Sequence, residues 1–434
     1  MNDSAMGPLL LRLSTLLSGV GLLIVGVGLL FSVLGLRAGL ADFSSITLGL
    51  VTSAYFAGFV LGTFLCPVII RRVGHIRAFA AMASLASTMP ILHAMWIDPW
   101  FWGLLRLVTG VCMVGLYIVI ESWLNALAPN ALRGRLFAVY MAVNFVALAL
   151  GQWLILVGDR LGFVPFAMVS VMFSFALLPI TMTRVAEPPP VEAPRLSLRN
   201  LYETSPMGMA SALASGLITG AFFGMAALFA QGVGFTDAQV ASFMAAAILG
   251  GAFFQWPVGH YSDSHDRRLV LLWVAALGSA VCVLGYVLAQ FSPDSLVPLS
   301  ILFGGLIFAI YGLCVAHVND LIDPSRLVEF SGGLLLIHGT GAAIGPTLAG
   351  VVMDQVGSDS LMLYFAAVMG LLALYITKRL GKGVAIPSEE KTSFVVMGGG
   401  SQAVLQMDPR GPADGEEVAP DGAAEAVAAA QDPR

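Results

Sequence analysis

Charged residues are scarce in this sequence. Asp, Glu, Lys and Arg make up 11% of its 434 residues, against about 25% in soluble domains. Hydrophobic residues make up 58% and the mean hydropathy is +0.88, which is more apolar surface than a soluble fold of this length can bury. The net charge of −5 also provides no basic surface for nucleic acid. These shortages exclude a soluble enzyme, a nucleic-acid-binding protein and a disordered chain.

Cysteine is scarce as well. The four cysteines are Cys66, Cys112, Cys282 and Cys314. All lie inside apolar stretches without a CxxC or other metal-ligand spacing, so we interpret them as small core residues and expect no metal and no cofactor. The sequence also lacks the GxxxxGK(S/T) loop that cradles nucleotide phosphates and the HExxH and GxSxG signatures of hydrolases. An ATP-driven pump and a membrane-embedded enzyme are therefore disfavoured.

Long apolar runs, by contrast, are abundant. Breaking the sequence at clusters of charge, Pro and Gly leaves twelve runs, each close to the roughly 20 residues that cross a bilayer as a helix. They cover residues 10–35, 46–70, 77–96, 100–127, 136–157, 163–183, 207–230, 238–258, 269–290, 297–318, 329–353 and 360–379. Barrel strands alternate in polarity and are about half as long. We therefore expect an all-α membrane protein with twelve transmembrane helices.

The distribution of basic residues predicts the orientation. With the N-terminus inside, 18 of the 21 Lys and Arg residues fall on the inner face, as the positive-inside rule requires. Only Arg37 and Arg160 then lie in outer loops, and Arg106 lies within a run. We expect a multi-pass integral membrane protein with both termini inside, in a bacterial inner (plasma) membrane.

The longest internal break divides the runs six and six. Residues 1–183 are expected to form an N-terminal six-helix half and residues 207–381 a C-terminal one, joined by a cytoplasmic linker at 184–206 that contains three consecutive prolines, 188–190. After residue 381 the sequence turns to Gly, Ala, Pro and acidic residues, which cannot bury enough apolar surface to fold alone. Residues 382–434 are therefore expected to be a disordered acidic cytoplasmic tail.

The two halves repeat one another in sequence. The matching pairs are Tyr117 with Tyr311, Asn125 with Asn319, Pro67 with Pro257, and Arg77 with Arg267. All lie at an offset of about 190–195 residues and between equivalent runs. Because each half has an even number of runs, both halves begin on the same side, which predicts parallel repeats related by an axis along the membrane normal.

A family signature follows the eighth run. Residues 259–268 resemble the loop Gly-x-x-x-Asp-(Arg/Lys)-x-Gly-(Arg/Lys)-(Arg/Lys) of the major facilitator superfamily, with Gly259, Asp263, Arg267 and Arg268 in matching positions. The copy in the first half, residues 67–77, has Arg71 where the acid is expected. The segments GHIRAF at 74–79, ESWLN at 121–125 and QWPVG at 255–259 resemble the uncharacterised YcaD-like branch of that superfamily.

The resemblance implies a transporter whose halves rock around a midplane cavity, lined by the first, second, fourth and fifth runs of each half. It implies gating-loop candidates at Arg72, Gly74, Arg77, Gly259, Asp263, Arg267 and Arg268. An inner-loop cluster, Asn319, Asp320, Asp323, Arg326 and Glu329, offers ion pairs to Arg133, Arg135, Arg267 and Arg268 when that face is closed. The alternative is that these charges are solvated and form no ion pairs, as is the case for most loop charges.

Polar residues within the runs are the candidates for contact with substrate or protons. They are Arg106, Tyr117, Glu121, Asn125, Asn144, Gln152, Gln255, Tyr311, His317, Asn319 and His338. Arg106 and Glu121 are the two charges clearly inside runs, where a charge is costly and faces a cavity or a partner. Fifteen residues separate them, about 22 Å of helix, so they cannot pair directly.

Each candidate also has a structural alternative. Arg106 resembles the fourth-span arginine that the superfamily associates with proton coupling, but it can equally snorkel outward and anchor its helix. Burial favours the neutral form of Glu121, which suits reversible proton carriage or binding of a cationic group. The structural alternative is a hydrogen bond to a facing helix or to a second-half loop. The histidines and amides can contact substrate or join helices to one another.

The sequence therefore favours a secondary transporter that moves a small, uncharged or amphipathic solute by alternating access, coupled to protons. Its expected partners are that solute, protons and the lipid bilayer, with no nucleic acid, and the chain is expected to act as a monomer. The alternative is a transporter-like membrane sensor or lipid handler whose tail recruits a partner. Substrate identity and the direction of transport do not follow from the sequence.

Overall fold

The structure is a computed structural model that describes residues 6–127, 132–158, 162–182, 188, 197–323, 326–381, 386–387, 389, 391–396 and 401, with side chains from residue 14 onward except at 180–182. The first half contains α1 (Met6–Leu40), α2 (Ser45–Val73), α3 (His75–Met95), α4 (Pro99–Leu127), α5 (Arg133–Trp153) and α6 (Val164–Met182). The second half contains α8 (Pro206–Gly232), α9 (Asp237–Ser264), α10 (Arg267–Phe291), α11 (Leu296–Asn319), α12 (Leu327–Val356) and α13 (Leu361–Leu380).

Each of the twelve predicted runs coincides with one of these helices. Among the described residues, eleven helices are long and apolar enough to cross a membrane, and α6 has a shorter apolar stretch, Val164–Pro179. The described part of the chain contains no strand. The prediction of an all-α, multi-pass membrane protein is therefore confirmed, while the orientation of its termini stays a prediction.

One further helix, α7 (Leu198–Thr204), was not expected. It lies at the end of the predicted linker, where the Ser197 side chain accepts a hydrogen bond from the Asn200 backbone N–H and Leu201 is buried. The capping serine and the burial of the leucine both stabilise this short helix. Most of the predicted linker lies outside the described residues.

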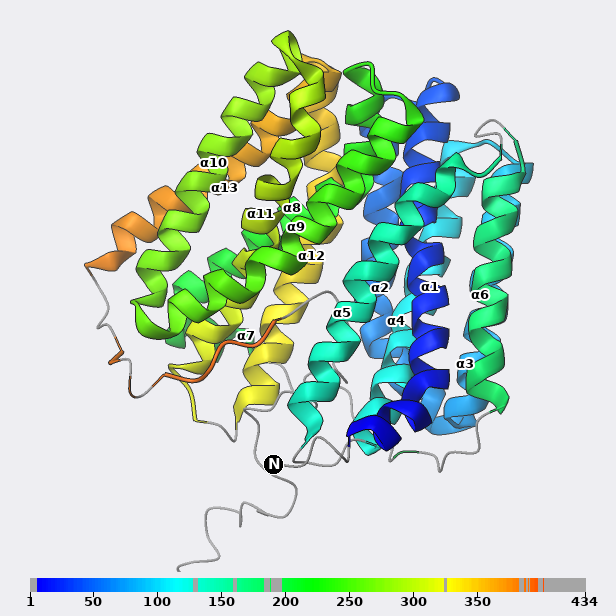
Figure 1. Cartoon of the computed structure of the whole chain (residues 1–434), viewed down its shortest axis with the longest axis horizontal. Coiled ribbons are helices and arrows are strands. Elements are labelled where there is room, and N and C mark those ends of the chain that lie inside the picture. The colour runs from blue at the N-terminus through cyan, green and yellow to red at the C-terminus, as the bar shows by residue number, and fades with distance from the viewer. Residues whose placement is uncertain are drawn as a thin grey trace, which may run out of the picture.

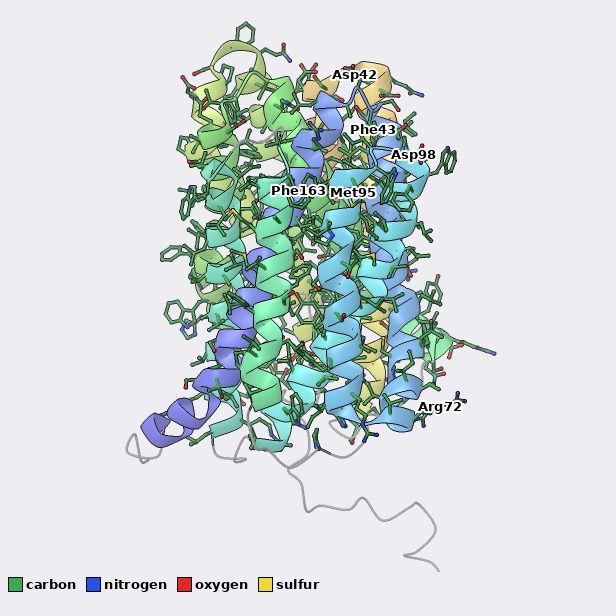
Figure 2. The ribbon with its side chains drawn as sticks, turned by 90° about the vertical axis from the view of Figure 1, so that its right-hand side faces the viewer. Asp42, Phe43, Arg72, Met95, Asp98 and Phe163 are labelled. Carbon is green, nitrogen blue, oxygen red and sulfur yellow. The ribbon has the colours of Figure 1, made fainter. Side chains whose placement is uncertain are left out.

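The helices form two groups that stand side by side. In Figure 1 the α1–α6 group lies on the right and the α8–α13 group on the left. Figure 2 shows Asp42 and Asp98 at one end of the bundle and Arg72 at the other. We call the end with Asp42 and Asp98 the far end. The opposite end, which carries Arg72 and the start of α1, is the terminal end.

The internal repeat is built into the packing of the helices. A Cβ on Gly58 of α2 would lie 2.1 Å from the carbonyl oxygen of Leu107 in α4. A Cβ on Gly250 of α9 would lie 2.0 Å from the carbonyl oxygen of Ile301 in α11. Three other pairs of glycines correspond in the same way: Gly110 with Gly304, Gly28 with Gly220, and Gly151 with Gly345. Only glycine permits such close approach of two backbones, so both halves use one packing scheme.

These glycine pairs also fix the register of the repeat. The offset is 192 residues between α2 and α9 and 194 residues between α4 and α11. The latter agrees with the pairing of Tyr117 with Tyr311. At an offset of 192, however, Pro67 corresponds to Gly259 and not to Pro257, two residues away. The pairing of Pro67 with Pro257 was suggested by two prolines that match only when the register is shifted by two residues.

Candidate functional site

A cavity of about 180 Å³ lies between the two halves. Its lining comes from α1, α2, α4 and α5 of the first half and from α8, α11 and α12 of the second. These are the helices that the repeat architecture places at the centre, except that α9 contributes no lining residue among those described. The cavity is therefore shared between the halves and does not belong to either alone.

Aromatic side chains dominate the cavity wall. They are Phe31, Tyr55, Phe56, Phe59, Tyr117, Phe145, Phe223, Phe308 and Tyr311. Two ring contacts cross from one half to the other, Phe31 with Phe223 at 5.4 Å and Phe145 with Phe308 at 6.4 Å between centroids. Aromatic pairs at such distances stabilise the contact between the halves.

The polar groups of the wall are few. They are the side chains of Thr63, Asn144, Ser215, Thr219 and His338, together with the two tyrosine hydroxyls at Tyr117 and Tyr311 and that of Tyr55. Among the described residues, no Asp, Glu, Lys or Arg lines the cavity. The site can therefore give a ligand a few hydrogen bonds and much apolar contact, but no ionic partner.

At the far end the two halves meet in close contact between α2 and α12. A Cβ on Gly49 would lie 2.5 Å from the Pro346 carbonyl oxygen, and a Cβ on Gly350 would lie 2.4 Å from that of Ser45. The Ser45 backbone N–H also donates to Asp354 Oδ1 at 3.0 Å. Backbones this close leave no passage between the two helices.

Four of the predicted substrate or proton residues line the cavity: Tyr117, Asn144, Tyr311 and His338. The ring of Tyr311 lies 4.6 Å from that of His338. Asn144 Nδ2 donates to the Tyr140 carbonyl oxygen at 2.8 Å. The internal repeat pairs Tyr117 with Tyr311, and the structure places both tyrosines in the wall of the cavity.

Arg106 lies behind the wall of the cavity. Its guanidinium carbon is 4.1 Å from the ring centroid of Tyr55 and 4.7 Å from that of Phe31. The residue is 2% exposed, so it does not snorkel to the surface. Its charge is held by the faces of two rings that line the cavity.

Glu121 is fully buried and lies beside the cavity, not in its lining. Its carboxylate accepts a hydrogen bond from the Tyr140 hydroxyl of α5 at 2.8 Å. It also accepts one from the backbone N–H of Ser401 at 3.0 Å. The contact with a facing helix was the alternative weighed for this residue, and the contact with the tail was not expected.

The other predicted polar residues lie away from the cavity. Gln152 joins α5 to α1, because its Nε2 donates to the Gly28 carbonyl oxygen at 3.1 Å and its Oε1 accepts from Ser32. Asn125 lies near the terminal end of α4. The remaining three, Gln255, His317 and Asn319, are buried in α9 and α11 but outside the lining.

The signature loop of the second half forms a buried ion cluster. Arg267 is 2% exposed and its guanidinium contacts Asp263 Oδ1 at 3.0 Å and Asp320 Oδ2 at 2.8 Å. Arg268 pairs with Asp266 at 2.8 Å. Burial raises the pKa of Asp266, but the hydrogen bonds and charge of Arg268 outweigh it and leave that pKa below its ordinary value. These pairs join α9, α10 and α11 within one half.

The first-half copy of the loop differs. Gly74 ends α2 with φ of 85°, a conformation that favours glycine, and Arg72 and Arg77 are exposed. Arg71, which stands where the second half has its acid, is exposed as well. The missing carboxylate thus accounts for the absence of a matching buried cluster among the described residues of this half.

The cavity aromatics and the tail contacts were missed by reasoning from the sequence. Phenylalanines that face the cavity and phenylalanines that face lipid look alike in a continuously apolar helix. In the tail, the apolar stretch FVVM at 394–397 was a usable signal, because it interrupts a polar and acidic sequence. Such an apolar stretch indicates a segment that packs against another part of the protein.

Two similar six-helix groups around one shared cavity define a membrane transporter built from parallel repeats. The sequence profile of the Major Facilitator Superfamily matches residues 13–332 and 207–407. The chain belongs to this superfamily, whose members are transporters and not enzymes.

Individual relatives agree with that assignment. The chain is 27% identical over 373 residues to the uncharacterised MFS-type transporter YcaD of Escherichia coli O17:K52:H18, covering 84% of this chain and 95% of YcaD. It is 28% identical over 346 residues to an uncharacterised MFS-type transporter of Enterobacter sp. (strain 638), covering 77% of this chain and 87% of that protein. The resemblance to the YcaD-like branch is confirmed.

Solved structures show the same fold. The nucleoside transporter NupG superposes with a TM-score of 0.70 at 14% identity, covering 86% of this chain and 100% of NupG. A bacterial homolog of the human lysosomal transporter Spinster, in an inward-facing and occupied conformation, gives a TM-score of 0.70 at 14% identity, covering 91% and 99% of the two chains. At these identities the likeness is one of fold alone.

Proposed function

We propose that this membrane transporter is a secondary transporter that carries a small, uncharged, largely apolar solute by alternating access and is driven by protons. The observation that supports the proposal most strongly is the cavity shared by the two halves, whose described lining is aromatic and contains no charged side chain. A charged solute would lose its hydration there without gaining an ionic partner.

The chemistry of the wall narrows the class of solute. Stacking on rings such as Phe59 and Phe308 favours a flat or apolar body. Asn144 and His338, which lie on opposite halves, offer hydrogen bonds to one or two polar atoms of the same ligand. A ligand that bridges these two side chains would bind both halves at once, which is what couples binding to movement of the halves.

The asymmetry of the two ends supports the proposal of alternating access. The far end is closed by direct backbone contact between α2 and α12 at Gly49 and Gly350. The contacts described at the terminal end come instead from the tail, which binds Asp263 and Asp320 on the second half and Glu121 on the first. With the N-terminus inside, as the basic residues predict, the far end is the outer end, and the closed outer contact must separate for a solute to cross.

Proton coupling is assigned to Glu121. It is a buried carboxylate one helical turn from Tyr117 of the cavity wall, and it accepts hydrogen bonds from both Tyr140 and the tail. Protonation removes the charge that these donors stabilise, so it changes the contacts of α4 with its neighbours. A carboxylate in this setting can translate a bound proton into a shift of the helix.

The experiment is a thermal-shift screen of a solute library on the purified protein, followed by uptake of the hits into proteoliposomes with an imposed pH gradient. We expect hits among uncharged aromatic solutes, and we expect Glu121→Gln to abolish gradient-driven uptake while exchange without a gradient continues. Glu203→Gln, which changes an exposed carboxylate of α7, is the matched control and should transport normally. Full gradient-driven uptake by Glu121→Gln would overturn the coupling assignment.

A further inference from the structure

A short segment of the C-terminal tail lies against both halves at the terminal end. We call residues 391–396 together with Ser401 the strap. In Figure 1 the segment that follows α13 runs across the terminal end of the second half. These contacts depart from the expectation of a tail without fixed structure, and the reason is local: the stretch that docks is the apolar one.

Phe394 anchors the strap between two helices of the second half. A Cβ on Gly259 of α9 would lie 2.0 Å from Phe394 Cδ1, and a Cβ on Gly312 of α11 would lie 2.8 Å from Phe394 Cζ. Both positions must therefore be glycine for the ring to fit, so the slot is shaped for an aromatic side chain. Val395 and Val396 pack against the same core.

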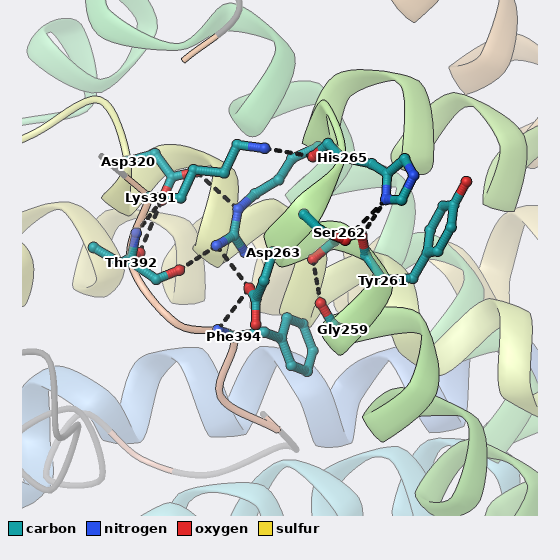
Figure 3. Close-up of polar contacts among 11 residues, drawn as sticks. Gly259, Tyr261, Ser262, Asp263, His265, Asp320, Lys391, Thr392 and Phe394 are labelled. Carbon is teal, nitrogen blue, oxygen red and sulfur yellow. Dashed lines mark hydrogen bonds and ion pairs between the residues drawn. The ribbon is translucent and has the colours of Figure 1, made fainter. Parts of the chain in front are cut away.

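Polar contacts hold the backbone of the strap around Phe394, as Figure 3 shows. The Phe394 N–H donates to Asp263 Oδ1 at 2.9 Å, and the Thr392 N–H donates to Asp320 Oδ1 at 3.0 Å. Arg267 donates to the Thr392 carbonyl oxygen while it pairs with both carboxylates. The buried ion cluster of the signature loop is thus also a binding site for a peptide backbone.

Ser401 carries the strap to the first half. Its backbone N–H and its hydroxyl both donate to the carboxylate of Glu121, the N–H at 3.0 Å. Ser401 and Glu121 are 1% and 0% exposed. Seven residues beyond Phe394, the tail therefore meets α4, so its described residues contact both halves.

The strap lies directly on the terminal side of the cavity. Tyr117 lines the cavity, and Glu121 lies one helical turn, about 6 Å, further toward the terminal end. On the second half, Tyr311 lines the cavity and the next residue, Gly312, forms part of the Phe394 slot. On both halves the strap is thus within about one turn of the cavity wall.

We propose that the strap is an internal plug: it binds across the terminal mouth of the cavity, links the two halves there, and must leave its slot before a solute can pass at this end. The terminal end accordingly recognises a peptide of stated chemistry: an aromatic residue packs against Gly259 and Gly312, and a small hydroxyl residue donates hydrogen bonds to Glu121. The plug depends on the shared cavity, but not on the identity of the solute or on proton coupling.

The test measures access to the cavity and needs no substrate. Thr63 lines the cavity from α2, on the terminal side of Phe59. A Thr63→Cys variant of the full-length protein is placed in nanodiscs, and the rate at which a charged maleimide labels the introduced cysteine is measured. Since all four native cysteines are buried, the parent protein gives the background. We expect Phe394→Ala to raise the labelling rate at least about tenfold, because it removes the partly buried ring that fills the slot between Gly259 and Gly312.

The matched control is Phe291→Ala, which removes a ring that is 83% exposed at the end of α10 and should leave labelling unchanged. A synthetic peptide of residues 388–403 is then added to the Phe394→Ala protein, and we expect it to restore protection. The same peptide with alanine at position 394 should not.

Two results would overturn the plug. One is equal labelling of Thr63→Cys with and without Phe394→Ala. The other is faster labelling that also occurs with Phe291→Ala or that the peptide does not reverse, since that would be general loosening of the fold. A second variant, Ser401→Pro, removes the N–H that binds Glu121 and should also raise labelling, whereas Ser401→Ala keeps that N–H and should raise it less.

Discussion

The close contact at the far end predicts that a single methyl group shifts the conformational balance. A Cβ on Gly49 would lie 2.5 Å from the Pro346 carbonyl oxygen and 3.0 Å from the Thr347 Cα, and both atoms belong to the backbone of α12. Neither can move aside as a flexible side chain would. Gly49→Ala should therefore destabilise the state in which this end is closed.

The size of the shift follows from the cost of overpacking. Forcing one extra methyl into a packed interface costs about 1–3 kcal/mol. At about 1.4 kcal/mol per tenfold, that moves the balance about 5-fold to 150-fold toward states open at the far end. The parent protein has no such penalty, so the two should differ strongly in exposure of residues between the halves.

The assay uses a reporter on a different helix pair. Leu228 of α8 faces α1 at the far end, where a Cβ on Gly39 would lie 3.1 Å from Leu228 Cδ1. In Leu228→Cys protein, labelling by a charged maleimide should be faster with Gly49→Ala than without it. Gly103→Ala is the control, since a Cβ there meets nothing within 4 Å. Unchanged labelling in a folded Gly49→Ala protein, or an equal rise with Gly103→Ala, would refute the reasoning.

Three further predictions concern stability, each measured as the midpoint of thermal unfolding. Gln152→Ala should lower stability by about 0.5–1.5 kcal/mol, since it removes the bonds between α5 and α1, and Gln290→Ala, on the exposed end of α10, should have little effect. Asp320→Asn should cost about 1.5–3 kcal/mol, because it removes one of the two carboxylates that pair with buried Arg267, whereas exposed Asp294→Asn should cost almost nothing. Arg106→Lys should cost about 1–2 kcal/mol, because a lysine does not stack flat on the rings of Tyr55 and Phe31; an unchanged midpoint in any of the three would contradict its contact.

The helices were predictable because their signal is strong. Each run is apolar over about 20 residues, and the bilayer leaves a helix as the only fold for such a run. The repeat was recognisable from the sequence because Tyr117 and Tyr311 are separated by about the same number of residues as the other matching pairs. The structure places both tyrosines in the wall of the cavity. The register of the repeat could not be predicted, because it is fixed by glycines at helix contacts. In the sequence, Gly58 is one small residue among many, and its role is recognisable only once its neighbour Leu107 is known.

The cavity and the strap were harder to predict for physical reasons. Which face of a uniformly apolar helix meets the cavity depends on the packing of neighbours and not on periodicity. Glu121 was recognised as a costly buried charge, but its partner Ser401 lies 280 residues away in a segment whose composition suggests disorder. Docking of that segment depends on Gly259 and Gly312, which only the folded second half brings together.

The central claim is that two rigid halves open one shared cavity at alternate ends. The most direct test is the distance between spin labels on both halves, measured by double electron–electron resonance in lipid with and without a transported solute. One pair, Arg71→Cys with Ser264→Cys, reports the terminal end, and another, Ile97→Cys with Ser292→Cys, reports the far end. We predict that the terminal distance shortens whenever the far distance lengthens. Distances at both ends that stay fixed while solute is transported would contradict the account.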